Sequence, residues 1–262
     1  MKTFAKYFRV WYLMSRNAFA GWIANRFGSV VLLIGKLLRF IFFFAFLTFL
    51  LKGTGTLAGY SLNETLFFFL TFTLIDTIAQ FLFREVYRFR PLVVSGGFDL
   101  VLTKPINALF RCLMGGADLL DLVTIPPLFV VVYLVGKSLS PTPIEIFYYF
   151  VLVINGLIIS AAFHIAVLAL GILTMEIDHT IMIYRDVTSL GRFPIDIYAA
   201  PLRFVLTYLI PIGVMVALPA KGLMGLTTPL VVLGAFAFGI LTVFLSLRFW
   251  RHALTKYSSA SS

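Results

Sequence analysis

Charged residues and cysteines are scarce in this sequence. Asp, Glu, Lys and Arg make up 12% of the 262 residues, about half of the ~25% found in a typical soluble domain. Apolar residues make up 61%, and the mean hydropathy is +1.01. This composition excludes a soluble domain and predicts a membrane protein with several spans. The single cysteine, Cys112, excludes an intrachain disulfide and a cysteine-based metal site.

Motifs for nucleotide, metal and nucleophile chemistry are also missing. The sequence contains no G-x-x-x-x-G-K-[ST] phosphate-binding loop, no H-E-x-x-H and no spaced Cys/His set. Ser95-Gly96-Gly97 lacks the preceding small residue and the histidine partner of an intramembrane serine protease. No convincing internal repeat of the secondary-transporter kind is found. We therefore expect no catalytic residue, no metal and no cofactor in this chain, so that any ATP is hydrolysed by another chain.

The positive charge follows the ends of the apolar segments. The net charge is +10, from 21 Lys and Arg against 11 Asp and Glu. Most of these cations fall in residues 1–26, in residues 84–111 and after residue 247, whereas the loops on the other side hold only Lys52, Lys137 and Lys221. Because Lys and Arg accumulate in cytoplasmic loops, both termini are predicted to be cytoplasmic. The basic charge then indicates contact with the lipid bilayer, and we expect no nucleic-acid partner.

The apolar segments predict an all-α polytopic membrane protein with six transmembrane helices and an N-terminal amphipathic interfacial helix. Residues 1–26 are basic on one helical face and aromatic on the other, which is typical of a helix lying in the membrane interface. Residues 27–250 form the six-span domain, and residues 251–262 a cytoplasmic tail. Five of the spans are predicted at residues 27–51, 62–83, 112–135, 144–173 and 226–249.

The remaining span is ambiguous. Residues 175–192 carry many charges, so hydropathy favours residues 201–219 as the fifth span. That segment, however, is punctuated by Pro194, Pro201, Pro211 and Pro219. In the alternative, residues 170–190 cross as a polar helix that faces other helices, and residues 193–222 form a re-entrant hairpin on the outer face. Both alternatives give six crossings.

Ionisable residues inside the predicted spans are candidates for paired or functional roles, because burying them in lipid is costly. They are Lys36, Arg39, Asp76, Asp118, Asp121 and His164. Lys36 and Arg39 either extend to the headgroups or pair with an acid at similar depth. A lone histidine is more often packed and hydrogen-bonded than a proton relay. Two alternative functions follow from this set. One is a membrane-embedded lipid-modifying enzyme that uses the three acids; the other is a proton-coupled carrier that uses Asp76 and His164.

The loop at residues 84–111 interrupts two apolar segments and is basic. It carries five cations against Glu85 and Asp99. Ser95-Gly96-Gly97 is predicted to break the chain, residues 98–103 to form a short amphipathic helix, and Lys104-Pro105 to end it. The sequence therefore predicts a short helix held out between two spans, on the cytoplasmic side.

Two stretches resemble the type-2 class of ABC export permeases. GGFDLVLTKPINALF is similar to the signature in their first cytoplasmic loop, and residues 191–225 are similar to a proline-rich run before the last span in a bacterial branch of these permeases. The charged residues 175–186 depart from that pattern. The resemblance implies a permease subunit of an ATP-driven exporter that is not itself an enzyme. It also implies an ABC ATPase subunit that binds ATP and Mg, a second permease, identical or related, and the bacterial inner membrane.

The resemblance also implies residue roles. Residues 98–105 would be the coupling helix that docks on the ATPase, and residues 2–22 a connector beside it. The implied partner-coupling residues are Phe98, Asp99, Leu100, Lys104, Pro105 and Asn107. Pro194, Pro201 and Pro211 would shape an outer gate. The abundance of phenylalanine favours an amphiphilic or hydrophobic cargo, but the sequence does not separate lipid-facing from pathway-facing residues and names no substrate.

Overall fold

The computed structural model describes residues 2–174 and 177–258. Within these residues the regular structure is helical, apart from one isolated bridge between Leu57 and Tyr60. The predicted all-α polytopic fold is therefore confirmed. Residues 1 and 259–262, which belong to the predicted N-terminal segment and tail, lie outside the described residues, as do residues 175–176.

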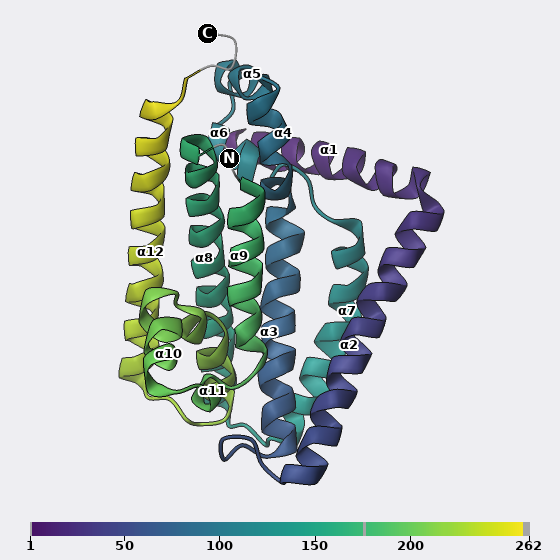
Figure 1. The fold of residues 1–262 in the computed structure, drawn as a ribbon, viewed down its shortest axis with the longest axis vertical. Helices are drawn as coiled ribbons and strands as arrows, with labels where there is room; N and C mark the ends of the chain where they lie inside the picture. The colour runs from purple at the N-terminus through teal and green to yellow at the C-terminus, as the bar shows by residue number, and fades with distance from the viewer. Residues whose placement is uncertain (1, 175–176, 259–262) are drawn as a thin grey trace.

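The first two helices meet at a sharp corner. Helix α1 (Lys2–Ala24) lies across one end of the bundle, and helix α2 (Arg26–Thr54) runs down the length of the bundle (Figure 1). Asn25 separates the two helices, and its side chain accepts a hydrogen bond from the Gly28 amide at 3.3 Å, which caps α2. Because α2 is continuous from Arg26, Lys36 and Arg39 lie inside the first span, as predicted.

Within the described residues, five helical segments are long and apolar enough to cross a membrane. They are α2, the segment Leu62–Val94 that begins with α3 (Leu62–Phe83), α7 (Leu119–Ser138), α8 (Pro143–Thr174) and α12 (Pro229–Lys256). The predicted start of the third span is wrong, because α6 (Ala108–Leu113) is separate and α7 begins after Asp118. A Cβ atom at Gly115 would lie 2.6 Å from the Arg111 carbonyl oxygen, so only glycine, which has no Cβ atom, fits at this break between α6 and α7.

The basic loop folds into four short helices at the same end of the bundle as α1 and the C-terminal end of α12 (Figure 1). They are η1 (Arg84–Arg88), α4 (Phe89–Val94), α5 (Gly97–Thr103) and α6. Gly96 has φ +72°, a left-handed conformation suited to glycine, and Lys104 is extended before Pro105. The predicted break, short helix and stop are confirmed. We refer to this end as the α5 end.

The charged segment after α8 forms a helix, and the proline-rich segment forms a bent hairpin. Helix α9 (Ile177–Ser189) packs against α8, η1 and α4, and is followed by η2 (Leu190–Arg192) and η3 (Ile195–Ile197). The hairpin consists of α10 (Ala200–Phe204), η4 (Val205–Leu209), η5 (Gly213–Ala217) and α11 (Leu218–Leu223). Its two arms meet at 79°. It lies at the end of the bundle opposite α5 (Figure 1), which we call the hairpin end.

Both ends of this hairpin are tied to one point. Asp196, just before the hairpin, accepts hydrogen bonds from Lys221 in α11 at 2.8 Å and from the Tyr60 hydroxyl at 2.9 Å. Tyr60 lies directly before α3, at the hairpin end. The chain therefore enters and leaves the hairpin at the same end, which is the arrangement of the re-entrant alternative, with the polar α9 and the segment after it connecting the two ends. By length and composition alone, the bent pair Ala200–Leu209 and Gly213–Leu223 also counts as a broken span.

The core is built around α3 and α8. One buried cluster joins both helices to the hairpin, and the close approach of Gly156 to the hairpin requires glycine, because a Cβ atom there would lie 2.3 Å from the Met215 carbonyl oxygen. In contrast, only 6% of the most apolar part of α2 is buried. This helix touches α3 mainly through phenylalanines around Phe43 and Phe69, whose ring centroids are 4.6 Å apart. The loose packing of α2 leaves room for a cavity on its inner side.

Candidate functional site

Helix α5 is anchored to the bundle by one buried aromatic ring. The side chain of Phe98 is 0% exposed and packs against Phe89, Trp250 and Tyr257, with ring centroids 5.2, 6.3 and 5.0 Å away. The opposite face carries Leu100, which is 65% exposed. Phe98 therefore fixes α5 to α12, and the outward residues of the predicted coupling set remain available to a partner.

The N-terminal helix braces the far end of α5. The Lys6 ammonium donates a hydrogen bond to the Pro105 carbonyl oxygen, and the Asn107 amide donates one to the Tyr7 hydroxyl at 3.2 Å. The rings of Tyr7 and Phe110 meet edge to face at 4.8 Å. Lys104 is exposed beside this contact. No local pattern in the sequence indicates the contacts of Lys6 and Tyr7, because their partners lie 99 and 100 residues away.

The C-terminal end of α12 holds the first turn of α5. The Tyr257 hydroxyl donates a hydrogen bond to the Asp99 carboxylate at 2.9 Å. Burial raises the pKa of Tyr257, and the hydrogen bond to Asp99 and its negative charge raise it further. This contact adds a second link between α5 and α12. The predicted coupling segment is thus connected to α1, the first described helix, and to Tyr257 directly after α12, the last.

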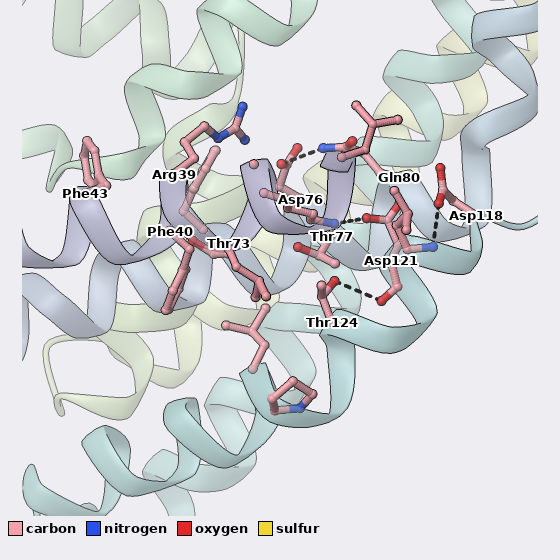
Figure 2. Close-up of a pocket in the computed structure, with 18 of the residues that line it drawn as sticks. Arg39, Phe40, Phe43, Thr73, Asp76, Thr77, Gln80, Asp118, Asp121 and Thr124 are labelled. Atoms are coloured by element: carbon pink, nitrogen blue, oxygen red, sulfur yellow. Dashed lines mark hydrogen bonds and ion pairs between the residues drawn. The ribbon is translucent and has the colours of Figure 1, made fainter. Parts of the chain in front are cut away.

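A polar cavity of about 620 Å³ lies between α2, α3 and α7. It is lined by five of the six ionisable residues predicted inside the spans, namely Lys36, Arg39, Asp76, Asp118 and Asp121. Figure 2 shows that Asp76 and Gln80 come from α3, Asp118 and Asp121 from the start of α7, and Arg39 from α2. The tertiary structure thus brings together charges that are up to 85 residues apart in sequence.

Two of the three cavity acids are already paired. Asp121, which is 3% exposed, forms an ion pair with Lys36. Asp118, equally buried, forms an ion pair with Arg84, whose Nε lies 3.1 Å from the carboxylate, and accepts a hydrogen bond from the Leu120 amide at 2.8 Å. Lys36 therefore pairs with an acid at similar depth, one of the two predicted alternatives. The two acids fix the start of α7 to α2 and η1.

Three cavity arginines have no carboxylate within ion-pair distance among the described residues. They are Arg39, Arg185 and Arg192. The third acid, Asp76, accepts a hydrogen bond from Gln80 at 2.7 Å. Arg84, Arg185 and Arg192 were missing from the predicted intramembrane set. The spacing of Arg185 and Arg192, seven residues or about two helical turns, was the available signal that they share a side.

His164 does not line this cavity. Its Nδ1 lies 2.8 Å from the Ser160 carbonyl oxygen, and its ring is surrounded by Phe83, Tyr87 and Tyr184 at centroid distances of 5.1, 6.5 and 5.1 Å. Its Nε2 is buried without a hydrogen-bond partner in the described part of the chain. The surroundings are those of a packed aromatic side chain.

The prolines predicted at an outer gate shape the hairpin. Pro194 precedes η3, Pro201 lies in the first turn of α10, and Pro211 lies at the bend between η4 and η5. Proline has no amide hydrogen, so the bend at Pro211 leaves one donor fewer to satisfy.

The contacts at the base of the hairpin form a compact polar group that sequence reasoning did not find. This hairpin-end cluster consists of Tyr60, Asp196, Arg203 and Lys221, with Arg203 3.9 Å from the Asp196 carboxylate. Burial alone would raise the pKa of Asp196, but hydrogen bonds from Lys221 and Tyr60 and the nearby positive charges lower it overall. The cluster closes the hairpin.

No group of three or more His, Cys, Asp or Glu side chains suited to a metal ion occurs among residues 2–174 and 177–258. In a comparison with protein families, residues 36–261 match a family described as ABC-2 family transporter protein. No curated protein and no solved structure matches the chain.

Proposed function

The chain belongs to the ABC-2 family of transporter proteins, and from this premise we propose that it is the permease subunit of an ATP-driven ABC exporter. Family membership and the apolar helices make it a multi-pass membrane transport protein. In the proposed complex, a separate ABC ATPase subunit binds ATP and Mg. A second permease, identical or related, completes the pathway.

The observation that carries the proposal is the attachment of α5. A helix that receives force from a partner must pass it on without deforming. Phe98 and Asp99 connect α5 to α12, and Pro105 is bound by α1 through Lys6. Displacement of α5 by an ATPase would therefore move α1 and α12 with it, and α1 leads directly into α2.

The outward face of α5 suits a docking groove. Leu100 and Leu102 are 65% and 42% exposed, and the exposed Lys104 follows at the end of the helix. Exposed leucines beside a cation at the tip of a rigid support are typical of an interface with an apolar centre and a polar rim. We propose that Leu100 enters the ATPase groove and that Lys104 contacts its edge.

The proposed orientation follows from charge and geometry together. The two described chain ends lie at the α5 end (Figure 1), and the predicted cytoplasmic cations belong to segments that meet there. We therefore propose that the α5 end is cytoplasmic, that the hairpin end faces outward, and that the protein resides in a bacterial inner membrane.

The test is copurification of the ATPase with the tagged full-length chain. Leu100→Asp and Lys104→Glu are expected to lower ATPase recovery about tenfold or more, because the first buries an unpaired carboxylate in the interface. Leu226→Asp is the matched control, since Leu226 is 55% exposed but lies at the hairpin end, and it should retain the ATPase. Undiminished recovery in both α5 variants, each still folded, would show that α5 is not the docking element.

The two alternative functions gain no specific support. A lipid-modifying enzyme would need Asp118 and Asp121 free to act, whereas both are held by cations. A carrier using Asp76 and His164 would need them in one pathway, whereas Asp76 lines the cavity and His164 does not. In the proposed exporter, by contrast, the attachment of α5 to α1 and α12 has a direct role, because it transmits the movement of the ATPase to the bundle.

A further inference from the structure

The cavity between α2, α3 and α7 has an apolar wall and three arginines that form no ion pair with any residue that the structure describes. We propose that it binds an anionic amphiphile, an acidic headgroup such as a phosphate or sulfate carried on an apolar chain. This substrate class is an inference that rests on the proposed exporter function, because only in a transporter would the occupant be cargo.

The charge balance of the cavity comes first. Its lining holds five cations and three acids. The ion pairs of Lys36 with Asp121 and of Arg84 with Asp118 cancel two of each sign. Arg39, Arg185 and Arg192 then face Asp76 alone, which leaves an excess of positive charge among the described cavity residues.

The three arginines act on one another. Arg39 and Arg185 lie near enough to Arg192 to repel its charge, whereas Asp76 attracts it. Packing like charges in a medium of low dielectric constant is costly unless an opposite charge joins them. An acidic headgroup would supply that charge, and the planar guanidinium groups match phosphate, sulfate and carboxylate oxygens in pairs.

The same cavity offers a place for an apolar chain. Phe40, Phe43, Phe69 and Phe72 line it together with aliphatic side chains of α7. The guanidinium of Arg192 lies over the rings of Phe43 and Phe72, 5.7 and 5.5 Å from their centroids. Anion-binding and apolar surfaces therefore adjoin at Arg192. The volume of about 620 Å³ lies within the ~300–1,000 Å³ of small-molecule sites.

The approach to the cavity is from the lipid side. Val31, Leu32 and Leu37 of α2 line the cavity and are 51%, 55% and 43% exposed on the apolar surface of the bundle. An occupant that passes α2 crosses hydrocarbon-facing side chains, which suits an amphiphile better than a hydrated inorganic anion. The cargo would enter from the bilayer.

Binding of radiolabelled dodecyl phosphate by the full-length chain in phosphatidylcholine nanodiscs tests the proposal. We expect saturable binding above that of empty nanodiscs. Arg39→Gln, Arg185→Gln and Arg192→Gln should each weaken it about tenfold or more, because each removes a charged hydrogen-bond donor. Arg251→Gln is the matched control, since Arg251 is an exposed cation near the cytoplasmic end of α12 and does not line the cavity.

A variant that is expected to bind the probe more tightly distinguishes an effect on the binding site from misfolding. Asp76→Asn removes the carboxylate that competes for the arginines, so it should tighten dodecyl phosphate binding by several-fold. Damage to the fold would instead weaken binding. Unchanged affinity in all three arginine variants, or weaker binding in an Asp76→Asn variant that circular dichroism and size-exclusion chromatography show to be folded like the wild type, would overturn the proposal.

Competitors identify the ligand chemistry. Dodecyltrimethylammonium should not displace the probe, because its headgroup is positive. Displacement by inorganic phosphate at the same concentration as by unlabelled dodecyl phosphate would overturn the amphiphile assignment, because the chain would then contribute nothing. Nanodiscs that contain phosphatidylglycerol distinguish the source. Displacement there supports a bilayer lipid as the occupant, and retention of the probe supports a single-chain amphiphile.

The outcome is independent of the coupling test, because binding is measured without the ATPase. The probe could bind with the expected variant pattern while no ATPase copurifies with the wild type or any variant. That result would support the anion site and contradict the exporter function. ATPase recovery without probe binding would do the reverse.

Discussion

The hairpin-end cluster and the cavity both hold more cations than acids, but they differ in how many of the cations lie within ion-pair distance of an acid. At the hairpin end, Asp196 is shared by Lys221, Tyr60 and Arg203, so the donors converge on one carboxylate that joins segments distant in sequence. In the cavity, the acids are outnumbered, and Arg39, Arg185 and Arg192 keep no ion pair among the described residues. We infer that a polar group saturated by its own chain holds the fold together, whereas an unsaturated one is available to a ligand.

The largest effect is expected from a paired cavity acid. Asp121→Asn removes the counter-charge of Lys36, and because breaking a buried ion pair costs about 3–5 kcal/mol and Lys36 is 29% exposed, we expect a loss of about 3 kcal/mol in the free energy of unfolding. Titration with sodium dodecyl sulfate in mixed micelles measures it. The double variant Lys36→Met/Asp121→Leu should recover much of the loss, and a double variant no more stable than the single one would contradict an ion-pair origin.

The hairpin-end cluster should give a smaller loss. Asp196→Asn weakens the hydrogen bonds from Lys221 and Tyr60, and since Asp196 is 26% exposed we expect a loss of about 1–2 kcal/mol in the same titration. Asp186→Asn is the control, because Asp186 is exposed and forms no ion pair in the described part of the chain. Equal losses in the two variants would mean that the cluster does not hold the hairpin.

The pH dependence sharpens this test. The folded-state pKa of Asp196 is lowered, so its stabilising effect is complete above the unfolded-state pKa of about 3.9 and is lost as the pH falls through the folded-state value. The stability difference between the wild type and Asp196→Asn should therefore be constant at neutral pH and shrink below about pH 4. The other acids titrate in both proteins, so their contribution cancels when the stability of the variant is subtracted from that of the wild type. A difference that is flat down to pH 2 would rule out a lowered pKa at this site.

The smallest effect is expected from an unpaired cavity arginine. Arg192→Gln loses the contacts with Phe43 and Phe72 but relieves the repulsion by Arg39 and Arg185. The two changes have opposite signs, so the free energy of unfolding should stay within about 1 kcal/mol of the wild type. A loss as large as that of Asp121→Asn would show that Arg192 belongs to a saturated structural group, and the contrast between the two regions would fail.

Local signals in the sequence account for much of the fold. Apolar segments of sufficient length predicted α2, α3, α8 and α12, because burial in lipid depends on composition over a window. Gly96 and Pro105 predicted the limits of α5, since their backbone restrictions act within a few residues. The candidate site was predicted in part: Lys36, Asp118 and Asp121 were among the predicted intramembrane charges, but whether Lys36 pairs with an acid or extends to the headgroups was left open.

Hydropathy did not predict the fold of residues 177–223, where polar and bent segments pack inside the bundle. Helix α9 was ambiguous because a helix that faces other helices needs no apolar window, and the hairpin was taken for a candidate span because a window does not detect a bend. Contacts such as Tyr60 with Asp196, 136 residues apart, have no local signature. The same applies to Lys6 with Pro105.

The sequence by itself determined that the protein is helical, lies in a membrane, and carries a basic loop with a short helix, because these properties depend on composition and on neighbouring residues. The tertiary structure decided which charges are neutralised and which remain open. That outcome depends on distances between side chains of different helices, and electrostatic energy in a medium of low dielectric constant changes steeply with those distances. Arg185 and Arg192 became candidate ligand-binding residues only when α9 and η2 placed them beside Asp76.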